Sequence, residues 1–453
     1  MSIWYEQAVF YHIYPLGLTG APRENPVNEE TSSDSARFET LISWIPHMKA
    51  LNCTAVYIGP LFDSSTHGYD TRDFRLIDRR LGTGDDFKRF VMDCHESGIR
   101  VVVDGVFNHT GREFFAFQDI QKNREASPYK DWYKGVNFGW ASPLGDPFGY
   151  DAWQGHFELP CLNLWNPAVR EYLFETVRFW IEEFDIDGIR LDCANVLDFG
   201  FMKELRARTA PMKKDFWLMG EVIHGEYGRW VNQEMLYSVT NYELHKAFYS
   251  AHNDHNYFEI AHNVRRLEAV GGRLYTFVDN HDEDRIASKL NNPAHLFPVY
   301  QLLFTLPGIP SIYYGSEWGI EGKRSKTSDT VLRPALSLEH DAAKDCALTK
   351  HIAALAAVHK TYPAFHGGSY QELLLTNRQY AFLRQADGCF LISAVNNDDS
   401  PAAAQIPVSF FPGTASYANN LLAPETPAIP VENGRLSVTL PPNGGVILKL
   451  MEE

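Results

Sequence analysis

Short apolar runs rich in β-forming residues alternate with amphipathic helical patterns from residue 8 of this 453-residue chain onward. Such alternation is typical of repeated βα units, whose buried parallel strands read as continuous apolar runs. Eight runs can be counted, which is the number that closes a (β/α)8 barrel. They span Ala8 to Tyr14, Ala55 to Ile58, Arg100 to Asp104, Gly188 to Asp192, Phe216 to Gly220, Ser238 to Tyr242, Leu274 to Val278 and Ile309 to Tyr314. The predicted fold class is therefore α/β, with a TIM barrel as its main domain.

The segments between these runs carry apolar residues at three- and four-residue spacings, as helices that cover a barrel do. The clearest cases are Phe38 to Ala50, Asp86 to Ser97 and Ala168 to Phe184. Asn166 and Pro167 supply a cap residue and a first-turn proline for the third of these helices.

The spacing of the predicted elements also indicates additions to the barrel. Roughly sixty residues separate the third strand from the next convincing helix, where short βα loops are usual. Their Gly, Pro and aromatic content predicts an irregular subdomain at the C-terminal rim of the barrel. After residue 364 short alternating strands follow, typical of an all-β domain. The predicted domains are the catalytic barrel (1–107 and 166–364), the inserted subdomain (108–165) and a C-terminal antiparallel β-sandwich (365–453).

The composition of the chain indicates which kinds of binding partner and which compartment to expect. A formal net charge of -16 and a pI near 5.5 disfavour binding to nucleic acid or to an anionic membrane. The six cysteines are scattered singly without a CxxC pair, which favours reduced thiols. The N-terminus lacks the pattern of a signal peptide, and no apolar run approaches the roughly 18 residues of a membrane span. We therefore expect a cytoplasmic protein that acts on a neutral substrate.

Carboxylates stand at the ends of several predicted strands, where barrel enzymes place their active sites. Two of them, Asp104 and Asp192, are the last residues of predicted strands. Glu221 directly follows a strand, and Asp282 ends the short loop after another. Taken singly, each could instead cap the next helix or pair with an arginine at the rim. Four carboxylates at one mouth of the barrel repel one another and raise one another's pKa. Such a cluster is typical of a site whose chemistry needs a proton donor beside an anion. Retaining glycosidases need such a pair about 5 to 5.5 Å apart, and strands four and five supply Asp192 and Glu221.

Four short motifs occur in a fixed order at these strand ends. They are Asp104-Gly105-Val106-Phe107-Asn108-His109, Gly188-Ile189-Arg190-Leu191-Asp192, Gly220-Glu221-Val222 and Phe277-Val278-Asp279-Asn280-His281-Asp282. Through them the sequence resembles the α-amylase family of glycoside hydrolases over nearly its whole length. The resemblance implies that Asp192 is the nucleophile, Glu221 the general acid/base and Asp282 a stabiliser of the transition state.

The same resemblance implies a set of residues that bind the sugar being cleaved. Arg190 holds Asp192 ionised, because side chains two residues apart on a strand share a face. By the same resemblance, His109 and His281 bind hydroxyls of the sugar. Tyr69 stacks beneath the sugar ring, and Asp104 supports the site. A lone His or Tyr is more often a structural residue, and the motif context favours the functional interpretation here.

Three further residues are candidates. Trp153 is a candidate substrate-binding platform, with packing at the rim as the alternative. Asn108 matches a position that binds a structural calcium ion in many family members, and a hydrogen bond to the loop backbone is the alternative. The reaction itself requires no cofactor. Asn195, three residues after the nucleophile, is a candidate substrate-binding residue that resembles the branch of cyclomaltodextrinases, neopullulanases and maltogenic amylases.

That branch usually carries an N-terminal β-domain, for which we expect no room here because the first strand begins near Ala8. Chain-length preference and oligomeric state therefore stay open. The expected function is retaining hydrolysis of α-1,4 bonds in maltooligosaccharides, cyclodextrins or starch-type glucans. A transglycosylase or an α-1,6-active glucosidase of the same family is the alternative, and a noncatalytic glucan-binding protein is a remote third.

Overall fold

A closed barrel of eight parallel strands forms the centre of the protein. The computed structural model describes residues 3–26, 36–326, 328–340, 346–413 and 415–452. The strand order is β10-β9-β8-β5-β2-β1-β12-β11, and a parallel bridge between Thr240 and Tyr275 closes it. The strands are β1 (Phe10–Ile13), β2 (Ala55–Ile58), β5 (Arg100–Gly105), β8 (Gly188–Leu191), β9 (Trp217–Gly220), β10 (Ser238–Val239), β11 (Tyr275–Phe277) and β12 (Ile309–Tyr313). The predicted (β/α)8 barrel is confirmed.

The sixth strand is shorter than its apolar run predicts. Strand β10 ends at Val239, and Tyr242, the last residue of that run, already begins a helix. The reason is Asn241, whose side chain accepts a hydrogen bond from the Leu244 N–H and so caps the helix. Local capping outweighs the β-propensity of the neighbouring Val and Tyr residues.

Helices surround the barrel where the apolar spacing predicts them. The predicted helix from Phe38 to Ala50 is divided in two, because Pro46 cannot donate a backbone hydrogen bond and begins a new first turn. The Asn166 side chain accepts from the Ala168 N–H and caps α6, as predicted. The helices in and around the barrel are α1 (Pro15–Leu18), α2 (Ala36–Ser43), α3 (Ile45–Ala50), α4 (Gly84–Glu96), α6 (Pro167–Phe184), α7 (Phe199–Thr209), α8 (Tyr242–Asn253), α9 (Tyr257–Arg266), α10 (Ile286–Lys289), α11 (Leu296–Thr305) and α12 (Ala347–Thr361).

Side chains of the barrel strands alternate between two environments. One set faces outward and joins the large core beneath the helices, for example Ile189 and Leu191 of β8. The other set fills the barrel interior with a separate cluster that includes Val102, Trp217 and Met219. The period of two residues along each strand produces this division. It also dictates that the next inward positions, toward the C-terminal ends of the strands, face the mouth of the barrel.

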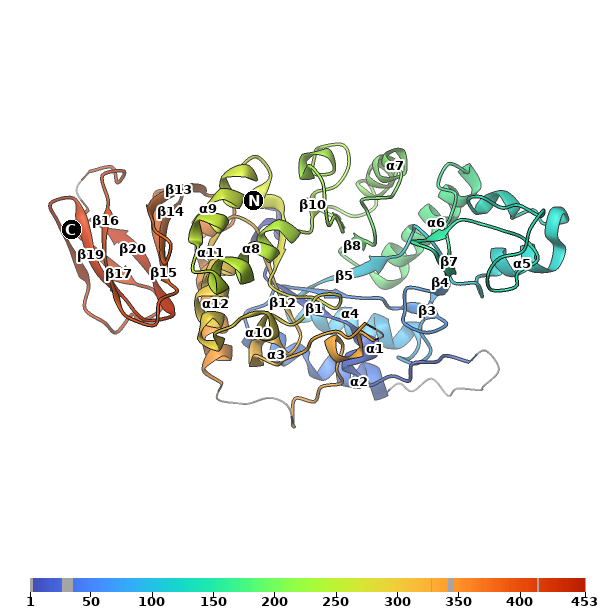
Figure 1. Cartoon of the computed structure of the whole chain (residues 1–453), viewed down its shortest axis with the longest axis horizontal. Coiled ribbons are helices and arrows are strands. Elements are labelled where there is room, and N and C mark those ends of the chain that lie inside the picture. The colour runs from blue at the N-terminus through green and yellow to red at the C-terminus, as the bar shows by residue number, and fades with distance from the viewer. Residues whose placement is uncertain (1–2, 27–35, 327, 341–345, 414, 453) are drawn as a thin grey trace.

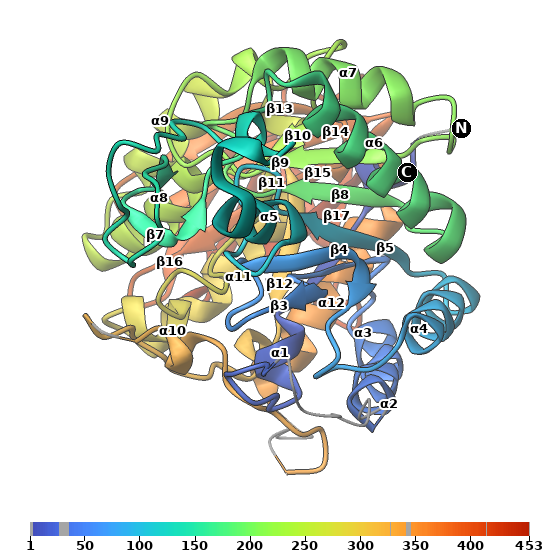
Figure 2. The same ribbon diagram turned by 90° about the vertical axis from the view of Figure 1, so that its right-hand side faces the viewer.

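The segment between β5 and α6 forms an inserted subdomain at one end of the molecule (Figures 1 and 2). It contains α5 (Phe115–Asn123) and the short hairpin of β6 (Ala152–Trp153) and β7 (His156–Pro160). A second hairpin, β3 (Phe62–Ser64) with β4 (Thr71–Ile77), lies beside it. Aromatic contacts hold much of the subdomain together. The ring of Phe117, for example, lies 4.9 Å from that of Tyr150 and 5.2 Å from that of Tyr133, measured between centroids.

An eight-stranded antiparallel sheet forms the opposite end of the molecule (Figure 1). Its strands are β13 (Ser369–Leu375), β14 (Gln379–Ala386), β15 (Cys389–Asn396), β16 (Ala402–Pro407), β17 (Tyr417–Asn420), β18 (Ile429–Glu432), β19 (Arg435–Leu440) and β20 (Gly444–Met451). Along β14, Tyr380 and Phe382 join the barrel core, whereas Ala381 and Leu383 join the core of the sheet itself. Strand β14 is therefore buried on both faces and attaches this domain to the barrel.

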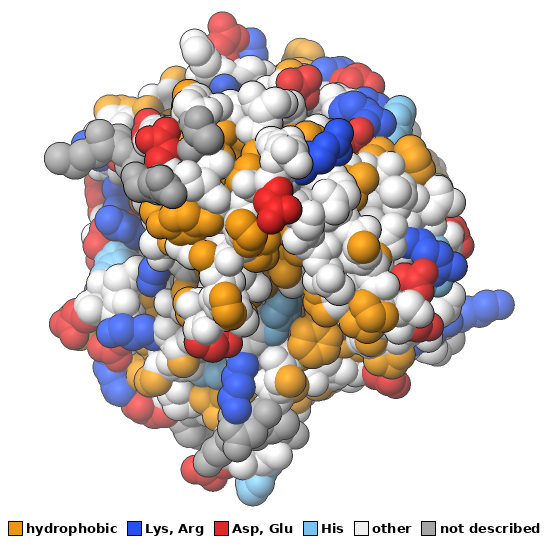
Figure 3. Space-filling view, turned by 90° about the vertical axis from the view of Figure 1, so that its left-hand side faces the viewer, with side chains coloured by type: hydrophobic (Ala, Val, Ile, Leu, Met, Phe, Trp, Pro, Cys, Tyr) orange, Lys and Arg blue, Asp and Glu red, His pale blue; other side chains and the backbone are white. Residues whose placement is uncertain are grey.

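The outer end of this C-terminal domain shows how its surface charge is distributed. Lys and Arg side chains lie mostly toward the margin of this face, several of them beside Asp or Glu side chains, and apolar and uncharged side chains cover most of the rest (Figure 3). A continuous basic surface, which polyanion binding requires, is not seen on this face. Among the described residues, no helix combines the length and the apolar character needed to cross a membrane.

Candidate active site

The catalytic carboxylates expected from the sequence lie together at the C-terminal mouth of the barrel. Trp217 and Met219 face the barrel interior on β9, so Glu221, two residues further, faces the mouth above them. On β8 the same alternation directs Arg190 and Asp192 inward. These three polar side chains are 7% exposed or less. Because side chains alternate along each strand, these residues from two strands form one buried cluster.

Backbone hydrogen bonds fix the residues at these strand ends. The Asp192 N–H donates to the Gly105 carbonyl at 3.1 Å, and the Glu221 N–H donates to the Leu191 carbonyl at 2.9 Å. Both bonds continue the ladders between neighbouring barrel strands beyond the last regular residue. The carboxylates therefore stand on rigid backbone, which suits groups that must hold a reactive geometry.

Arg190 is the centre of the cluster. Its Nη1 donates to Asp192 Oδ1 at 2.8 Å and to Asp104 Oδ1 at 2.9 Å, and its Nη2 lies 2.9 Å from Glu221 Oε2. Burial opposes the charged form, but Asp104 and Glu221 together raise the pKa of this guanidinium well above its usual value. One permanent cation therefore contacts three buried carboxyl groups, a task that a planar fork of five donors performs and an ammonium does not.

Glu221 is placed to carry a proton. Burial raises the pKa of its carboxyl group, and the neighbouring Asp192 adds to the rise while Arg190 opposes it. Its Oε1 accepts a 3.3 Å hydrogen bond from the Tyr242 hydroxyl, which in turn accepts one from the Asn280 side chain at 3.2 Å. The Tyr242 contact is not evident from the sequence, where that residue falls at the end of a predicted strand.

Asp282, in contrast to Glu221, has a lowered pKa. Burial alone would raise its pKa, but His281 and Arg333 outweigh that effect and hold the pKa of this carboxyl far below its usual range. Arg333 Nη2 lies 2.8 Å from Asp282 Oδ1, and His281 Nε2 lies 3.0 Å from Asp282 Oδ2. The Asp282 side chain is 42% exposed, so water screens part of these interactions. Arg333 lies in a segment without helical or strand periodicity, and no signal in the sequence identified it.

A second hydrogen-bond chain links the rest of the predicted sugar-binding set. The hydroxyls of Tyr57 and Tyr69 both donate to Asp104 Oδ2, at 2.8 and 3.1 Å. The Tyr69 hydroxyl also lies 2.6 Å from His281 Nε2, and the two rings stack with centroids 5.6 Å apart. Tyr69 therefore links Asp104 to His281, which lies beside the carboxylate of Asp282.

His109 and Trp153 lie side by side at the edge of the inserted subdomain. Their rings stack at 6.1 Å between centroids. The Asn108 amide donates to His109 Nδ1 at 3.1 Å, so the ring proton is on Nε2. That buried Nε2 and the buried Nδ1 of His281 find no hydrogen-bond partner within the described part of the chain. Such groups are rare in folded proteins, and a ligand that supplies hydroxyls would satisfy them.

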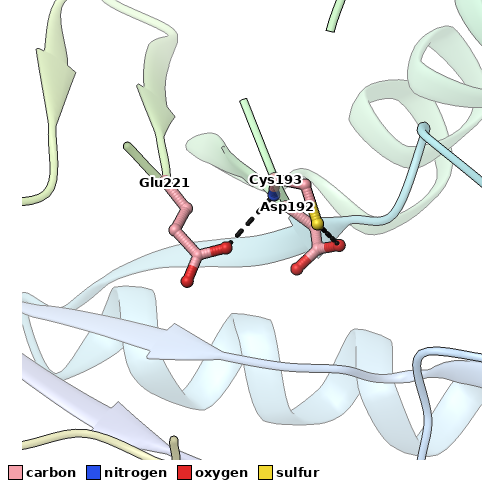
Figure 4. Close-up of side chains that lie close together, drawn as sticks. All are labelled: Asp192, Cys193 and Glu221. Carbon is pink, nitrogen blue, oxygen red and sulfur yellow. Dashed lines mark hydrogen bonds between the residues drawn. The ribbon is translucent and has the colours of Figure 1, made fainter. Parts of the chain in front are cut away.

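Asn195 does not join the cluster. It lies in the turn after Asp192, is exposed, and makes no side-chain hydrogen bond to any described residue. The neighbouring Cys193 does join it, although the sequence indicated only a reduced thiol there. Its thiol donates to Asp192 Oδ2 at 2.8 Å, and its backbone N–H donates to Glu221 Oε2 at 3.2 Å (Figure 4).

Asn108, the predicted calcium ligand, has two neighbours that are not oxygen ligands. Calcium prefers six to eight oxygen ligands with several carboxylates. The neighbours of the Asn108 side chain are a ring nitrogen of His109 and the Cys161 thiol. In the described ranges, the one group of at least three acidic, His or Cys side chains with ligand atoms within 4.8 Å is Asp192, Cys193 and Glu221, and the Arg190 guanidinium already bonds both of its carboxylates. Calcium binding by Asn108 stays a prediction, and no step of the chemistry is assigned to a metal.

Comparison with known proteins agrees with this geometry. The family profile described as alpha amylase, catalytic domain, matches residues 29–353. A cyclomaltodextrinase from Geobacillus thermopakistaniensis is 32% identical over 98% of this chain and 77% of its own length. The intracellular maltogenic amylase of Bacillus subtilis is 29% identical over 71% of this chain and 57% of its own length. The crystallised debranching enzyme of Nostoc punctiforme has a TM-score of 0.83 and 29% identity, covering 99% of this chain and 100% of that one.

The chain therefore belongs to the α-amylase family, and it is a glycoside hydrolase of that family. Its relatives include enzymes named cyclomaltodextrinase and maltogenic amylase, so the branch indicated by the motifs is also confirmed.

Proposed function

We propose that this protein is a retaining hydrolase of α-1,4-glucosidic bonds in maltooligosaccharides, cyclodextrins or starch-type glucans. The observation that carries the proposal is the convergence of Asp192 and Glu221. A carboxylate oxygen from each of them lies, with the Cys193 sulfur, in one group whose members are all within 4.8 Å of one another. Inverting enzymes hold their carboxyl groups about 6.5 to 9.5 Å apart to admit a water molecule, so this closeness favours direct attack by one carboxylate.

The environment of each carboxylate gives it a different role. Glu221, whose pKa is raised, holds the proton that the leaving oxygen takes as the glycosidic bond breaks. Asp192, bonded to Arg190, attacks the anomeric carbon from the other side and forms a covalent β-glycosyl-enzyme. Glu221, now an anion, then removes a proton from the water that displaces Asp192. Two inversions restore the α configuration.

Asp282 and the histidines complete the site. Asp282 stays anionic because His281 and Arg333 keep its pKa low, so it can stabilise positive charge that develops at the anomeric carbon. The unpartnered ring nitrogens of His109 and His281 are suited to sugar hydroxyls, and Tyr69 presents its ring beside them. These groups suit a neutral, hydroxyl-rich substrate.

The names of the relatives support α-glucans as the substrate class. The Geobacillus relative is a cyclomaltodextrinase and the Bacillus subtilis relative a maltogenic amylase. The test is a timed product analysis on maltotriose, β-cyclodextrin and amylose, with NMR of the first product. Release of the α-anomer, and loss of at least about 1,000-fold in kcat for Asp192→Asn, are expected. Initial release of the β-anomer, or full activity of Asp192→Asn, would refute the proposal.

A second candidate is cleavage or transfer at α-1,6 bonds. It is favoured by the likeness to the Nostoc punctiforme enzyme, which is named a debranching enzyme. Pullulan and isomaltose distinguish the two functions, since α-1,4 hydrolysis of pullulan gives panose and α-1,6 hydrolysis gives maltotriose. A noncatalytic role fits poorly, because the carboxylates and Arg190 are all present and in mutual contact.

We also propose that the protein acts in the cytoplasm. The Bacillus subtilis relative is named intracellular, and the six cysteines are all free thiols in the structure. Fractionation of the producing cells should place the protein with the cytoplasmic contents. Recovery mainly from the culture medium would contradict this assignment.

A further inference from the structure

The two oxygens of the Asp192 carboxylate have different donors. Oδ1 accepts from the Arg190 guanidinium at 2.8 Å, and Oδ2 accepts from the Cys193 thiol at 2.8 Å. Figure 4 shows the sulfur directly beside that carboxylate, with the Glu221 carboxylate facing the same space. Cys193 is 6% exposed, so water does not compete strongly for its bond.

Cys193 also contacts the second catalytic group. Its backbone N–H donates to Glu221 Oε2 at 3.2 Å. The residue has a φ of 48°, in the left-handed region that residues other than glycine adopt only at an energetic cost. A conformation of this kind persists where the surrounding contacts determine it, and here those contacts are two catalytic carboxylates.

The sulfur is a thiol and not a thiolate. Burial raises the pKa of Cys193, and the neighbouring Asp192 and Glu221 carboxyl groups raise it further. The group therefore keeps its proton and acts as a hydrogen-bond donor. It is not a competing nucleophile, because the thiolate is the reactive form.

We propose that Cys193 is a positioning residue that holds Oδ2 of Asp192 in line for attack on the anomeric carbon. The inference rests on the proposed function, in which Asp192 is the nucleophile. A thiol is a weak donor, so it orients the oxygen and withdraws less electron density from it than a hydroxyl does. As the Oδ2–C1 bond forms, the C1–O bond breaks, its electron pair passes to the leaving oxygen, and that oxygen takes the Glu221 proton. The thiol keeps its own proton throughout.

Two variants and two substrates test this role. Cys193→Ala deletes the donor, and Cys193→Ser restores one of similar size. The substrates are 4-nitrophenyl α-maltoside and α-maltosyl fluoride, and fluoride departs with little help from a general acid. For Cys193→Ala we expect kcat/KM to fall about fivefold on both substrates, the value of one hydrogen bond of about 1 kcal/mol. The loss on the fluoride places the effect at the nucleophile and not at Glu221.

The split between kcat and KM supplies the readout that a purely structural role would not give. Without the thiol, Oδ2 of Asp192 loses the donor that orients it for attack, so on α-maltosyl fluoride kcat should carry the loss in Cys193→Ala while KM stays within about twofold. Cys193→Ser should return kcat toward the wild-type value. Cys94→Ala is the matched control, because it deletes the same atom from a buried thiol on α4 that does not contact the carboxylates.

The possible outcomes distinguish a failure of the positioning role of Cys193 from a failure of the proposed hydrolase function. Wild-type kcat/KM in both Cys193 variants, or a loss in Cys193→Ala that is carried by KM alone, overturns the inference alone. So does a Cys193→Ala defect that is confined to thermal stability and is matched by Cys94→Ala. Absence of turnover by the wild type on both substrates overturns the proposed function and, with it, the inference.

Discussion

Arg190 and Asp192 lie two residues apart at the end of β8 and are joined by a 2.8 Å bond from Nη1 to Oδ1. The spacing directs both side chains into the barrel mouth, where Arg190 also contacts Asp104 and Glu221. The orientation of Asp192, the proposed nucleophile, and the protonation of Glu221, the proposed acid, therefore depend on one guanidinium. The consequences of this and neighbouring contacts can be measured.

Replacing Arg190 by lysine should lower kcat/KM by at least about 100-fold. A charge-assisted hydrogen bond contributes about 1.5 to 3 kcal/mol, and a compact ammonium cannot keep all three carboxyl partners. Steady-state kinetics on maltotriose gives the value. Arg384→Lys is the control, since that buried guanidinium donates to backbone carbonyls between the barrel and the C-terminal domain. A comparable kinetic loss in the control would show that any buried arginine produces the effect.

The raised pKa of Glu221 should appear in the pH dependence of activity. In the proposed mechanism Glu221 must be protonated for the first step, so kcat/KM should fall as pH rises through its pKa, above the value of about 4.3 for a free Glu side chain. Asp282 ionises at much lower pH and does not contribute to this limb. In Glu221→Gln the limb should be absent from the residual activity on α-maltosyl fluoride. Its persistence would assign the limb to another group.

The same pKa has a consequence for stability. Because folding raises it, the folded state binds this proton more tightly than the unfolded chain. The stabilisation is complete below the unfolded value and is lost as pH rises through the folded value. Glu221→Gln, which stays neutral, should therefore gain Tm relative to the wild type as pH increases from 4.5 to 8. A constant difference across that range would contradict the shift.

Arg333→Ala should lower kcat/KM about fivefold. Asp282 loses its guanidinium partner and retains His281, and the 42% exposure of its side chain reduces the bond to about 1 kcal/mol. Asp329→Asn is the matched control, because Asp329 is the other carboxylate that Arg333 contacts, at 2.7 Å. The control should remain within twofold of the wild type. An equal loss in both variants would locate the effect in the loop and not at Asp282.

Gly445→Ala should destabilise the junction between the barrel and the C-terminal domain. A Cβ atom at this position would lie 2.3 Å from the Ala394 carbonyl oxygen and 2.4 Å from the Gln301 side chain. Overpacking of this kind costs about 1 to 3 kcal/mol. Urea denaturation measures it, with Gly367→Ala as control, because nothing lies within 4 Å of a Cβ there. Unchanged stability of Gly445→Ala would show that the junction can relax.

The barrel and its principal carboxylates could be predicted because their signals are local. Eight apolar runs mark the strands, and the two-residue period places Asp192 and Glu221 on the inner face whatever the loops do. The Asn166 cap of α6 likewise depends only on adjacent residues. Strand six was overestimated because its last residues cap and begin a helix.

Contacts between distant segments were decided by the tertiary structure alone. Arg333 reaches Asp282 across 51 positions, and the Tyr242 hydroxyl reaches Glu221 across 21. No periodicity encodes such pairs, because they depend on how complete loops pack over the barrel. Cys193 directly follows Asp192 in the sequence, yet the bond from its thiol depends on a left-handed backbone that only the folded chain holds. The sequence by itself thus determined which chemistry stands at the strand ends, and packing decided which partners orient it.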